Sequence, residues 1–377
     1  MHVGFFINTP AHAHLYRETI RQLEDREIDV TVFARDDSCT LDILDYYDIA
    51  YLVYGARNGG RLELAQELPG HLWRIKRAVA DRSLDVIFGM GVYSTYAAWL
   101  ANATAITVMD SEPLAFKQRL TSPIVGAFLT PASFRRDLGP KHFVFDGFKE
   151  TAYLHPAIFT PTGDARQALE LSHEESFSIV RFNAFNGHHD MGRAGFSTEQ
   201  KQELIRELDQ FGTVFVSDEA EKLDISALPA KPYDAHPALM HDALAEADLL
   251  IADTQTMVTE AALLGTPAIR SNSFVGDGDM GNFQTLESAG LVWNYPTFEG
   301  VLEAATTILS DPDMDETLRE RHATFMADKC NLTAVFVDLV ESLAAGQSIE
   351  SALSHHGSLR PNVVDHDTRS QATESHP

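Results

Sequence analysis

Short apolar runs alternate with longer amphipathic segments along the first 110 residues of the chain. The first run, Val3–Ile7, leads into Thr9-Pro10, a pair that suits a helix start because proline fits the first helical position. Other runs predict strands over residues 30–33, 50–54, 86–88 and 105–109, and amphipathic segments predict helices over residues 40–47, 71–81 and 93–101. Short apolar strands separated by helices indicate a parallel sheet with helices on both faces.

The same pattern starts again after a polar stretch between residues 155 and 176. Strands are predicted over residues 177–182, 213–217, 249–252 and 267–270, and helices over residues 198–211, 237–246, 256–264, 297–309 and 331–344. We therefore expect an α/β protein with two Rossmann-like, doubly wound domains that face each other across a cleft. The N-terminal domain takes residues 1–160 and the C-terminal domain residues 170–345. Residues 346–377 are polar, and we expect them to form a disordered tail.

The composition narrows the class of protein. Of 377 residues, 44% are hydrophobic, which is typical of packed globular domains and excludes a disordered chain. The two cysteines, Cys39 and Cys330, exclude a disulfide scaffold and a cysteine-based zinc site. The N-terminus lacks the basic segment of a secretory signal, and no run of about 18 apolar residues predicts a membrane span. We therefore expect a cytoplasmic protein.

The chain is strongly acidic, with 29 Lys and Arg against 55 Asp and Glu and a net charge of −26. Such a charge repels phosphates and anionic membranes, so we expect no nucleic-acid partner, although a local basic site can still hold one small anion. The acidic residues are spread along the chain. This spread favours a halophilic protein from a high-salt cytoplasm, where screening removes most self-repulsion, over an ordinary acidic protein.

The segment from Ala247 to Pro267 is the richest in chemical information. A predicted strand over residues 249–252 ends in a short polar turn, and a helix then runs to Gly265. The free N–H groups and the dipole at a helix start suit a pyrophosphate. Glu260 lies about one turn into this helix, where it can accept hydrogen bonds from a ribose diol. The alternative is that the turn only caps the helix.

This turn and the run Glu260-Ala-Ala-Leu-Leu-Gly-Thr-Pro267 resemble the nucleotide-sugar motif of GT-B glycosyltransferases and UDP-GlcNAc 2-epimerases. The resemblance implies that Glu260 binds the ribose. It also implies that Thr254, Gln255, Thr256 and Met257 surround the phosphates.

A wider set of motifs resembles a narrower group, the archaeal domain-of-unknown-function family 354, whose members are predicted glycosyltransferases of GT-B type. The motifs are Asn8-Thr-Pro-Ala-His-Ala-His14, Arg181, His188-His189-Asp190, Ser217 and Asp253-Thr-Gln-Thr-Met257. The resemblance covers about residues 1–340.

His12 and His14 follow the first predicted strand. In the GT-B fold the equivalent loop faces the cleft between the domains. An imidazole titrates near neutral pH, so either histidine can serve as general base on an acceptor hydroxyl or donate to a phosphate. The sequence leaves these two roles open, and helix capping or a surface position is the alternative to both.

Arg181 and the loop His188-His189-Asp190 are candidates for holding the donor. A guanidinium offers a planar fork of donors to a diphosphate, with a structural ion pair as the alternative. We expect the loop to cover the donor sugar or diphosphate, with a solvated loop as the alternative. Metal binding is disfavoured, because adjacent residues do not easily point at one ion and the spacing specifies no zinc site.

Glu112 and Arg119 belong to a run that is similar to a 2-epimerase segment whose Glu and Arg line the active site. This similarity implies that Glu112 is a general base or a partner of a sugar hydroxyl, and that Arg119 assists it. The 2-epimerases also place a catalytic Asp in a turn that here reads Gly89-Met-Gly-Val-Tyr93. Because that carboxylate is missing, the sequence favours transfer over epimerisation.

The sequence thus predicts a metal-independent GT-B-type glycosyltransferase without a cofactor. It would move a sugar from a nucleotide diphosphate sugar, with UDP-sugars favoured, to an unknown acceptor, and His12, His14 and Glu112 are the candidate catalytic residues. One alternative is a nucleotide-sugar epimerase or hydrolase of the same fold. The other is a noncatalytic nucleotide-sugar-binding protein, which would retain Glu260 but tolerate loss of the candidate catalytic residues.

Overall fold

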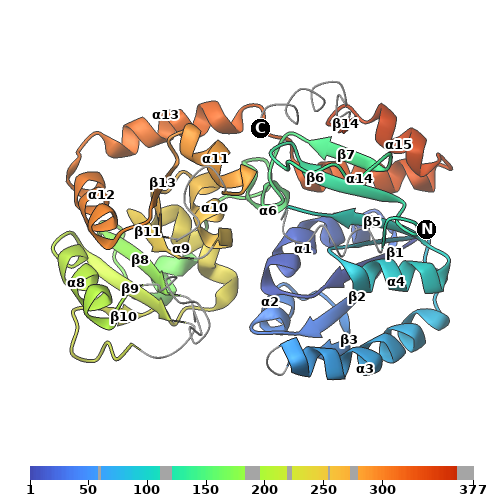
Figure 1. The fold of residues 1–377 in the computed structure, drawn as a ribbon, viewed down its shortest axis with the longest axis horizontal. Coiled ribbons are helices and arrows are strands. Elements are labelled where there is room, and N and C mark those ends of the chain that lie inside the picture. The colour runs from blue at the N-terminus through green and yellow to red at the C-terminus, as the bar shows by residue number, and fades with distance from the viewer. Residues whose placement is uncertain are drawn as a thin grey trace, which may run out of the picture.

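The computed structural model describes residues 1–57, 61–110, 121–182, 196–218, 223–253, 255–271 and 279–362. The chain forms two α/β domains that lie side by side (Figure 1). Each domain has its own sheet, of eight strands in the N-terminal domain and six in the C-terminal domain among the described residues. The predicted fold class, two doubly wound domains, is confirmed.

The N-terminal sheet has the order β14-β7-β6-β5-β4-β1-β2-β3, and all its pairs are parallel except β14 with β7. Its strands are β1 (His2–Ile7), β2 (Asp29–Asp36), β3 (Tyr51–Ala56), β4 (Val86–Gly89), β5 (Thr104–Val108), β6 (Ala127–Pro131), β7 (His142–Phe145) and β14 (Leu359–Pro361). The C-terminal sheet has the order β10-β9-β8-β11-β12-β13 and is parallel throughout. Its strands are β8 (Phe177–Phe182), β9 (Thr213–Asp218), β10 (Lys231–Pro232), β11 (Leu249–Ala252), β12 (Ala268–Ser271) and β13 (Val292–Tyr295).

Helices cover both faces of the N-terminal sheet because successive side chains of a strand point to opposite faces. Phe5 of β1 contacts Tyr16 and stacks on Phe88, on the side of α1. The next residue, Phe6, stacks on Phe33 in the cluster that α3 and α4 cover. The helices of this domain are α1 (Pro10–Glu24), α2 (Thr40–Tyr46), α3 (Arg61–Ala80), α4 (Val92–Ala101), α6 (Thr151–Leu154), α14 (Leu332–Ala344) and α15 (Ile349–His355).

The C-terminal sheet is built in the same way. Val180 and Ile251 belong to a core cluster with α8 and α12, whereas the neighbouring Ile179 and Leu250 face the main core. The helices are α7 (Asp164–Ala168), α8 (Thr198–Leu208), the short 3-10 helix η2 (Pro237–Leu239), α9 (Met240–Glu246), α10 (Gln255–Leu264), α11 (Gly281–Ser288), α12 (Phe298–Ser310) and α13 (Met314–Met326).

Three sequence-based expectations about the elements are wrong. The helix expected over residues 71–81 begins ten residues earlier, at Arg61, and contains Pro69. The tail expected from residue 346 is ordered up to residue 362, because α15 buries Ala352 and Leu353 and β14 pairs with β7. The helix α14, which we assigned to the C-terminal domain, instead packs on α1 and α6. Residues 363–377 lie outside the described part.

Candidate functional site

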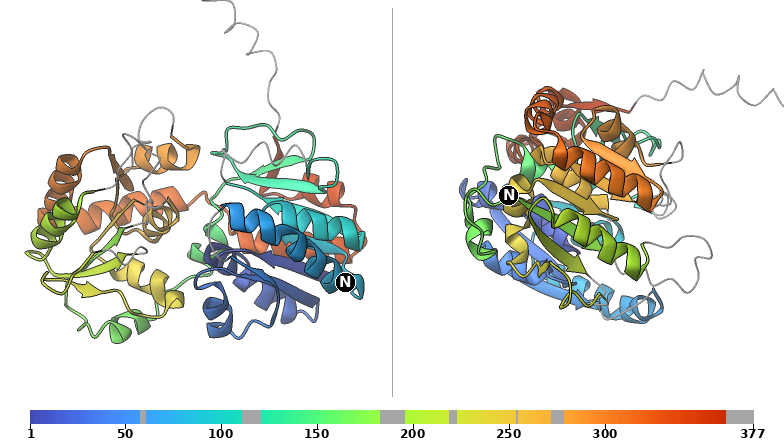
Figure 2. Two further views of the ribbon diagram at one scale, coloured as in Figure 1. Left: turned by 60° about the horizontal axis from the view of Figure 1, so that its bottom comes forward. Right: turned by 90° about the vertical axis from the view of Figure 1, so that its left-hand side faces the viewer.

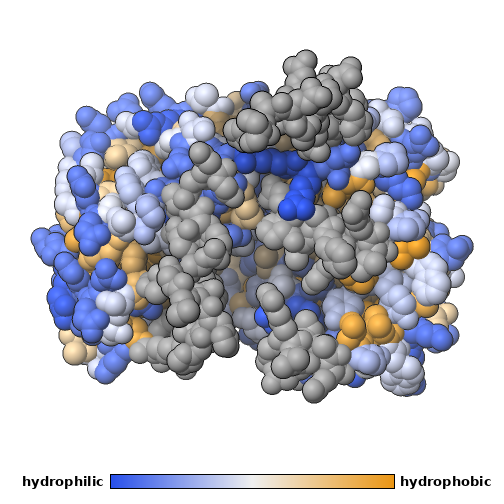
Figure 3. Space-filling view, viewed as in Figure 1, coloured by the Kyte–Doolittle hydropathy of each residue, from blue (hydrophilic) through white to orange (hydrophobic). Residues whose placement is uncertain are grey.

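The strand order of each sheet reverses at one point, between β1 and β4 and between β8 and β11. Ligands of open α/β sheets bind at the carboxyl ends of the strands beside such a reversal. In the N-terminal domain Asn8 follows β1, and its Nδ2 donates to the backbone oxygen of Met90, just after β4, at 3.4 Å. Figure 3 shows the surface hollowed between the two domains, and we call this hollow the cleft.

Glu260 lies in the second turn of α10 and is buried. Its Oε1 accepts a hydrogen bond from the hydroxyl of Tyr153 at 2.7 Å and lies 3.1 Å from Nε2 of His241. Burial alone would raise the pKa of this carboxyl, but His241 and Tyr153 together hold the pKa of Glu260 below its ordinary value. Within the described residues, Oε2 has no hydrogen-bond partner. One oxygen of an ionised carboxylate is thus fixed, and the other is left for a further donor.

His14 of α1 connects the N-terminal domain to Glu260 through His241. The two imidazole rings are 4.4 Å apart between centroids and nearly perpendicular, at 80°. The guanidinium of Arg17 donates to Nδ1 of His14 at 3.0 Å, so the neutral ring carries its proton on Nε2. Burial, with the charges of His241 and Arg17, lowers the pKa of His14 well below its ordinary value. The side chain of His14 is 6% exposed, so an uncharged imidazole forms this contact between the two domains.

A second contact joins the domains on the outer side of His14. The Arg17 guanidinium lies 4.4 Å from the centre of the Tyr47 ring and also hydrogen-bonds its hydroxyl. That hydroxyl donates to the backbone oxygen of Ala238 in the other domain at 3.3 Å. Beside it, the ring of Tyr46 stacks on that of His236 at 4.8 Å between centroids. The seam between the domains is therefore aromatic and polar.

Asp110, Lys149 and Glu150 form a charged cluster at the carboxyl end of the N-terminal sheet. The Lys149 ammonium donates to Oδ2 of Asp110 and lies 3.2 Å from Oε1 of Glu150. Burial alone would lower the pKa of Lys149, but the two carboxylates raise it above its ordinary value. Burial, aided by Asp110 and Glu260 and opposed by Lys149, raises the pKa of Glu150 to about 7. Glu150 is thus a carboxyl that exchanges its proton near neutral pH.

His12 lies close to this cluster at the start of α1. The backbone N–H of Asn8 donates to its Nδ1 at 3.3 Å, so Nε2 carries the proton of the neutral ring. Burial and the nearby Lys149 lower the pKa of His12 to about 3, although Asp110 opposes the shift. Near neutral pH, His12 therefore offers an N–H donor rather than a free nitrogen lone pair.

The loop between β1 and α1, just before His12, is held in place by buried side chains. The hydroxyl of Tyr54 donates to Oδ1 of Asn8 at 2.5 Å. The guanidinium of Arg35 donates to the backbone oxygen of Asn8 at 2.9 Å and pairs with Asp37 at 2.7 Å. All these side chains are buried, so they fix the start of α1 and with it the position of His12.

In the C-terminal domain, Arg181 and Ser217 are paired neighbours on β8 and β9. The Arg181 guanidinium donates to the hydroxyl of Ser217 at 2.7 Å, which fixes its position at the carboxyl ends of these strands. At the start of α10, Gln255 is exposed, whereas the side chain of Met257 is buried in the core. Met257 can therefore face a phosphate only through its backbone N–H.

Seven of the thirteen sequence-predicted site residues have described positions, and four of these, namely His12, His14, Arg181 and Glu260, lie where the domains face each other. Glu112, Arg119, His188, His189, Asp190 and Thr254 lie outside the described residues.

The structure adds a set of residues that the sequence analysis missed, namely Asp110, Lys149, Glu150, Tyr153 and His241. Asp110 directly follows the strand expected over residues 105–109, which is a sequence signal for a site, whereas Lys149, Glu150, Tyr153 and His241 show no such signal.

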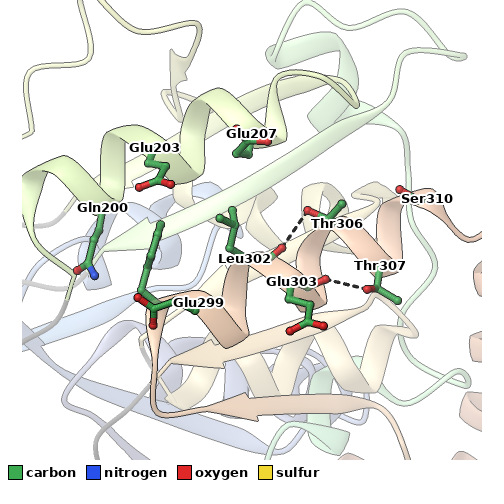
Figure 4. A pocket seen from close by; sticks show the side chains of 10 residues that line it. Gln200, Glu203, Glu207, Glu299, Leu302, Glu303, Thr306, Thr307 and Ser310 are labelled. Carbon is green, nitrogen blue, oxygen red and sulfur yellow. Dashed lines mark hydrogen bonds between the residues drawn. The ribbon is translucent and has the colours of Figure 1, made fainter.

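A separate groove of about 730 Å³ lies between α8 and α12, at the outer edge of the C-terminal domain (Figure 4). Four glutamates line it, namely Glu203, Glu207, Glu299 and Glu303. Carboxylates repel a phosphorylated ligand, so this groove is unsuited to a nucleotide. Over the described residues, no group of three or more His, Cys, Asp or Glu side chains is arranged to hold a metal ion.

Solved structures of two kinds share this fold. The UDP-GlcNAc 2-epimerase of Neisseria meningitidis, bound to UDP-GlcNAc, superposes with a TM-score of 0.62 at 15% identity, over 92% of this chain and 100% of that one. The UDP-GlcNAc 2-epimerase of Methanocaldococcus jannaschii superposes with a TM-score of 0.58 at 16% identity, over 83% of this chain and 94% of that one. MurG of Acinetobacter baumannii superposes with a TM-score of 0.54 at 17% identity, over 90% of this chain and 99% of that one. No protein-family model matches the chain, and no curated protein matches it by sequence. At these identities the likeness establishes the GT-B fold alone.

Proposed function

We propose that this protein is a GT-B-type glycosyltransferase that uses a nucleotide diphosphate sugar, with UDP-sugars favoured. The fold supports a nucleotide-sugar site, because the Neisseria epimerase of this fold holds UDP-GlcNAc. One observation carries the proposal: Glu260 is a buried, ionised carboxylate at the carboxyl end of a parallel sheet, with one oxygen fixed by Tyr153 and His241. Its other oxygen accepts the ribose hydroxyls in our proposal.

The donor lies along α10 and the end of β8 in this proposal. The diphosphate accepts hydrogen bonds from the first N–H groups of α10, where the helix dipole favours negative charge. Arg181, held by Ser217, supplies the positive charge that stabilises the leaving diphosphate. These groups neutralise the leaving group without requiring a metal ion.

The proton of the acceptor hydroxyl goes to Asp110 in our proposal. Both candidate histidines accept a hydrogen bond on Nδ1, so His12 donates its Nε2–H to a substrate oxygen and His14 positions His241. Asp110 is a carboxylate at the rim of the N-terminal sheet, and Lys149 holds its Oδ2. As the acceptor oxygen bonds to the anomeric carbon, the diphosphate leaves with the electron pair and Asp110 takes the proton.

A second candidate is a nucleotide-sugar epimerase of the same fold. The observation that favours it is the cluster of Asp110, Lys149 and Glu150, since Glu150 has a pKa of about 7. Two carboxyls beside one ammonium supply the acid and the base that the turn Gly89-Met-Gly-Val-Tyr93 lacks.

We also propose membership of the archaeal domain-of-unknown-function family 354. The motif residues Arg181 and Ser217 hydrogen-bond each other, and the motif loop of Asn8 and His12 faces the same cleft, which supports the grouping. The dispersed acidic residues support a high-salt origin.

A thermal-shift screen tests the proposed function. We expect one class among UDP-, GDP-, dTDP- and CDP-sugars to stabilise the protein, by about 2.7 kcal/mol at about 100 times its dissociation constant. Arg181→Gln should weaken that binding about tenfold or more, because it removes a charge-assisted hydrogen bond to the diphosphate. The exposed Arg206→Gln on α8 is the matched control and should bind normally. The absence of a shift with every nucleotide sugar, in folded protein, would contradict the proposed function.

A further inference from the structure

Two tryptophans on the N-terminal domain are unusually exposed. Trp73 of α3 is 60% exposed and Trp99 of α4 is 59% exposed, more than any other large apolar side chain of the described residues. They are two of the three tryptophans of the chain. An exposed indole leaves a large apolar area in water, so a pair of them on one domain points to a surface that is covered when the protein works.

The two helices that carry them lie side by side on the same face of the sheet (Figure 2). On α4, Val92, Tyr96 and Trp99 follow each other at intervals of four and three residues, so they share one side of the helix. On α3, Leu68 and Trp73 are also exposed, but five residues separate them, so they lie on different sides of the helix. We group Trp73 of α3 with these three side chains of α4 as an apolar stripe, because the two helices pack against each other.

Cations lie close to this stripe in the sequence, and one of them is in contact with it, since the Arg77 guanidinium lies 5.6 Å from the centre of the Trp73 ring. Arg74, Lys76, Arg77 and Arg82 lie within residues 74–82, with Asp81 as the only acid between them. This local net charge of +3 contrasts with the net charge of −26 of the whole chain. We call the apolar stripe and these four cations the α3–α4 face.

The α3–α4 face also begins next to the cleft. In a parallel sheet each helix starts near the carboxyl end of the strand before it, and α3 follows β3 as α4 follows β4. Val92, the first residue of α4, comes two residues after Met90, whose backbone oxygen accepts the hydrogen bond from Asn8. A molecule covering this face would therefore lie at the rim of the candidate site.

We propose that the α3–α4 face docks onto the surface of an anionic lipid bilayer. Indole rings favour the boundary between headgroups and acyl chains, and arginine and lysine favour anionic headgroups. Within the described residues, no helix has the length and apolarity needed to cross a membrane, so docking involves the surface only. A lipid-anchored acceptor could then reach the cleft, a consequence that rests on the proposed function, whereas the docking does not.

Electrostatics favours this partner over a second copy of the chain. In a symmetric dimer through this face, the cations of one copy would meet the cations of the other, which is unfavourable. An anionic surface meets them with opposite charge. Acidic residues elsewhere on the protein matter less, because salt screens charges that lie more than about 8 Å apart at 0.15 M and more than about 3 Å apart at 1 M, whereas the cations of this face touch the headgroups directly.

Flotation of the full chain with vesicles tests the proposal. We expect binding to vesicles of phosphatidylcholine and phosphatidylglycerol, little binding to phosphatidylcholine alone, and a blue shift of tryptophan emission on binding. Two variants should reduce the bound fraction about tenfold or more, one with Trp73→Ser and Trp99→Ser and one with Lys76→Glu and Arg77→Glu. The matched controls are Val53→Ser, exposed on the edge strand β3, and Arg206→Glu with Arg319→Glu, exposed on α8 and α13.

Three outcomes would overturn the proposal. One is that the wild type does not bind anionic vesicles, and another is that the variants of the α3–α4 face bind as well as the controls. The third is sedimentation of the wild type as a dimer that the Trp73 and Trp99 substitutions make monomeric, because the face then serves a second copy. Nucleotide-sugar binding is measured on the same samples. Its loss in all of them would count against the proposed function and not against docking.

Discussion

The protonation states of buried side chains decide which residue can take a proton in the cleft. His12 and His14 both accept a hydrogen bond on Nδ1, and burial keeps the pKa of each below its ordinary value. Each therefore presents Nε2–H and is a donor. Asp110 is the carboxylate beside His12, and Lys149 keeps its charge fixed in place. In our proposal the base and the donor of the reaction are therefore different residues.

Asp110→Asn tests this assignment. We expect the release of nucleoside diphosphate from the bound sugar nucleotide to slow by a factor of about 10² to 10⁴, because the amide cannot take the proton. The affinity for the nucleotide should change by no more than a factor of about three, because Asp110 lies in the N-terminal domain and the proposed nucleotide site lies in the C-terminal domain. Asp36→Asn, exposed at the end of β2, is the matched control. Normal turnover in Asp110→Asn would exclude the carboxylate as base.

The sequence identifies the position of Glu260 but not its partners. A carboxylate one turn into a helix that follows a buried strand is visible as a pattern. Tyr153 is 107 residues away along the chain, and the two side chains meet only when the domains pack. The cluster of Asp110, Lys149 and Glu150 was missed for the same reason, since long-range packing makes the three neighbours.

At the level of elements, buried parallel strands are the part that sequence patterns predict well. The strand expected over residues 249–252 matches β11 to the residue, and that over residues 177–182 matches β8. The helix α3 was predicted too short because a proline usually ends a helix, yet Pro69 lies inside it. The segment after residue 346 was expected to be disordered because it has few apolar residues. Three of them, Ala352, Leu353 and Leu359, are nevertheless enough to pack against the core at one edge of the N-terminal domain.

Removal of α15 and β14 tests how much this edge contributes. We expect a chain ending at residue 346 to lose about 3–6 kcal/mol of unfolding free energy, because Leu353 and Leu359 are buried and each contributes about 1.5–3 kcal/mol. Loss of the strand pairing with β7 adds to this. The control is a chain ending at Asn362, which keeps both elements. Equal urea midpoints for the two chains would show that the edge is dispensable.

At the scale of the whole molecule, the two domains are held by a seam of buried polar and aromatic groups. His14, His241, Tyr153 and Glu260 lie in direct contact there, and Tyr47 reaches Ala238 beside them. A neutral His14 fits this seam, whereas a charged one would be buried beside Arg17 without a new partner. The stability of the assembled protein should therefore depend on the protonation of His14.

Acidification should destabilise the protein through this histidine. The folded-state pKa of His14 is well below its ordinary value of 6.5, so the unfolded chain binds more protons below pH 6.5 and unfolding becomes easier as the pH falls. The slope reaches about 1.4 kcal/mol per pH unit for one group. Urea unfolding between about pH 5 and about pH 6.5 measures it. His14→Gln should lower the slope, and the exposed His355→Gln should not. Equal slopes in wild type and His14→Gln would contradict this account. The raised pKa of Glu150 makes the folded protein more stable as the pH falls, which opposes the effect of His14. This contribution is the same in the wild type and both variants, so it does not change the comparison.

The central claim is that Glu260 holds the ribose of a bound nucleotide. Calorimetric titration of wild type and Glu260→Gln with UDP and with 2′-deoxy-UDP tests it most directly, because only the ribose hydroxyl differs between the two ligands. The account predicts that wild type binds UDP about ten to a hundred times more tightly than 2′-deoxy-UDP, and that Glu260→Gln loses most of this preference. Equal affinity of the wild type for both nucleotides, or the same preference in Glu260→Gln, would contradict it.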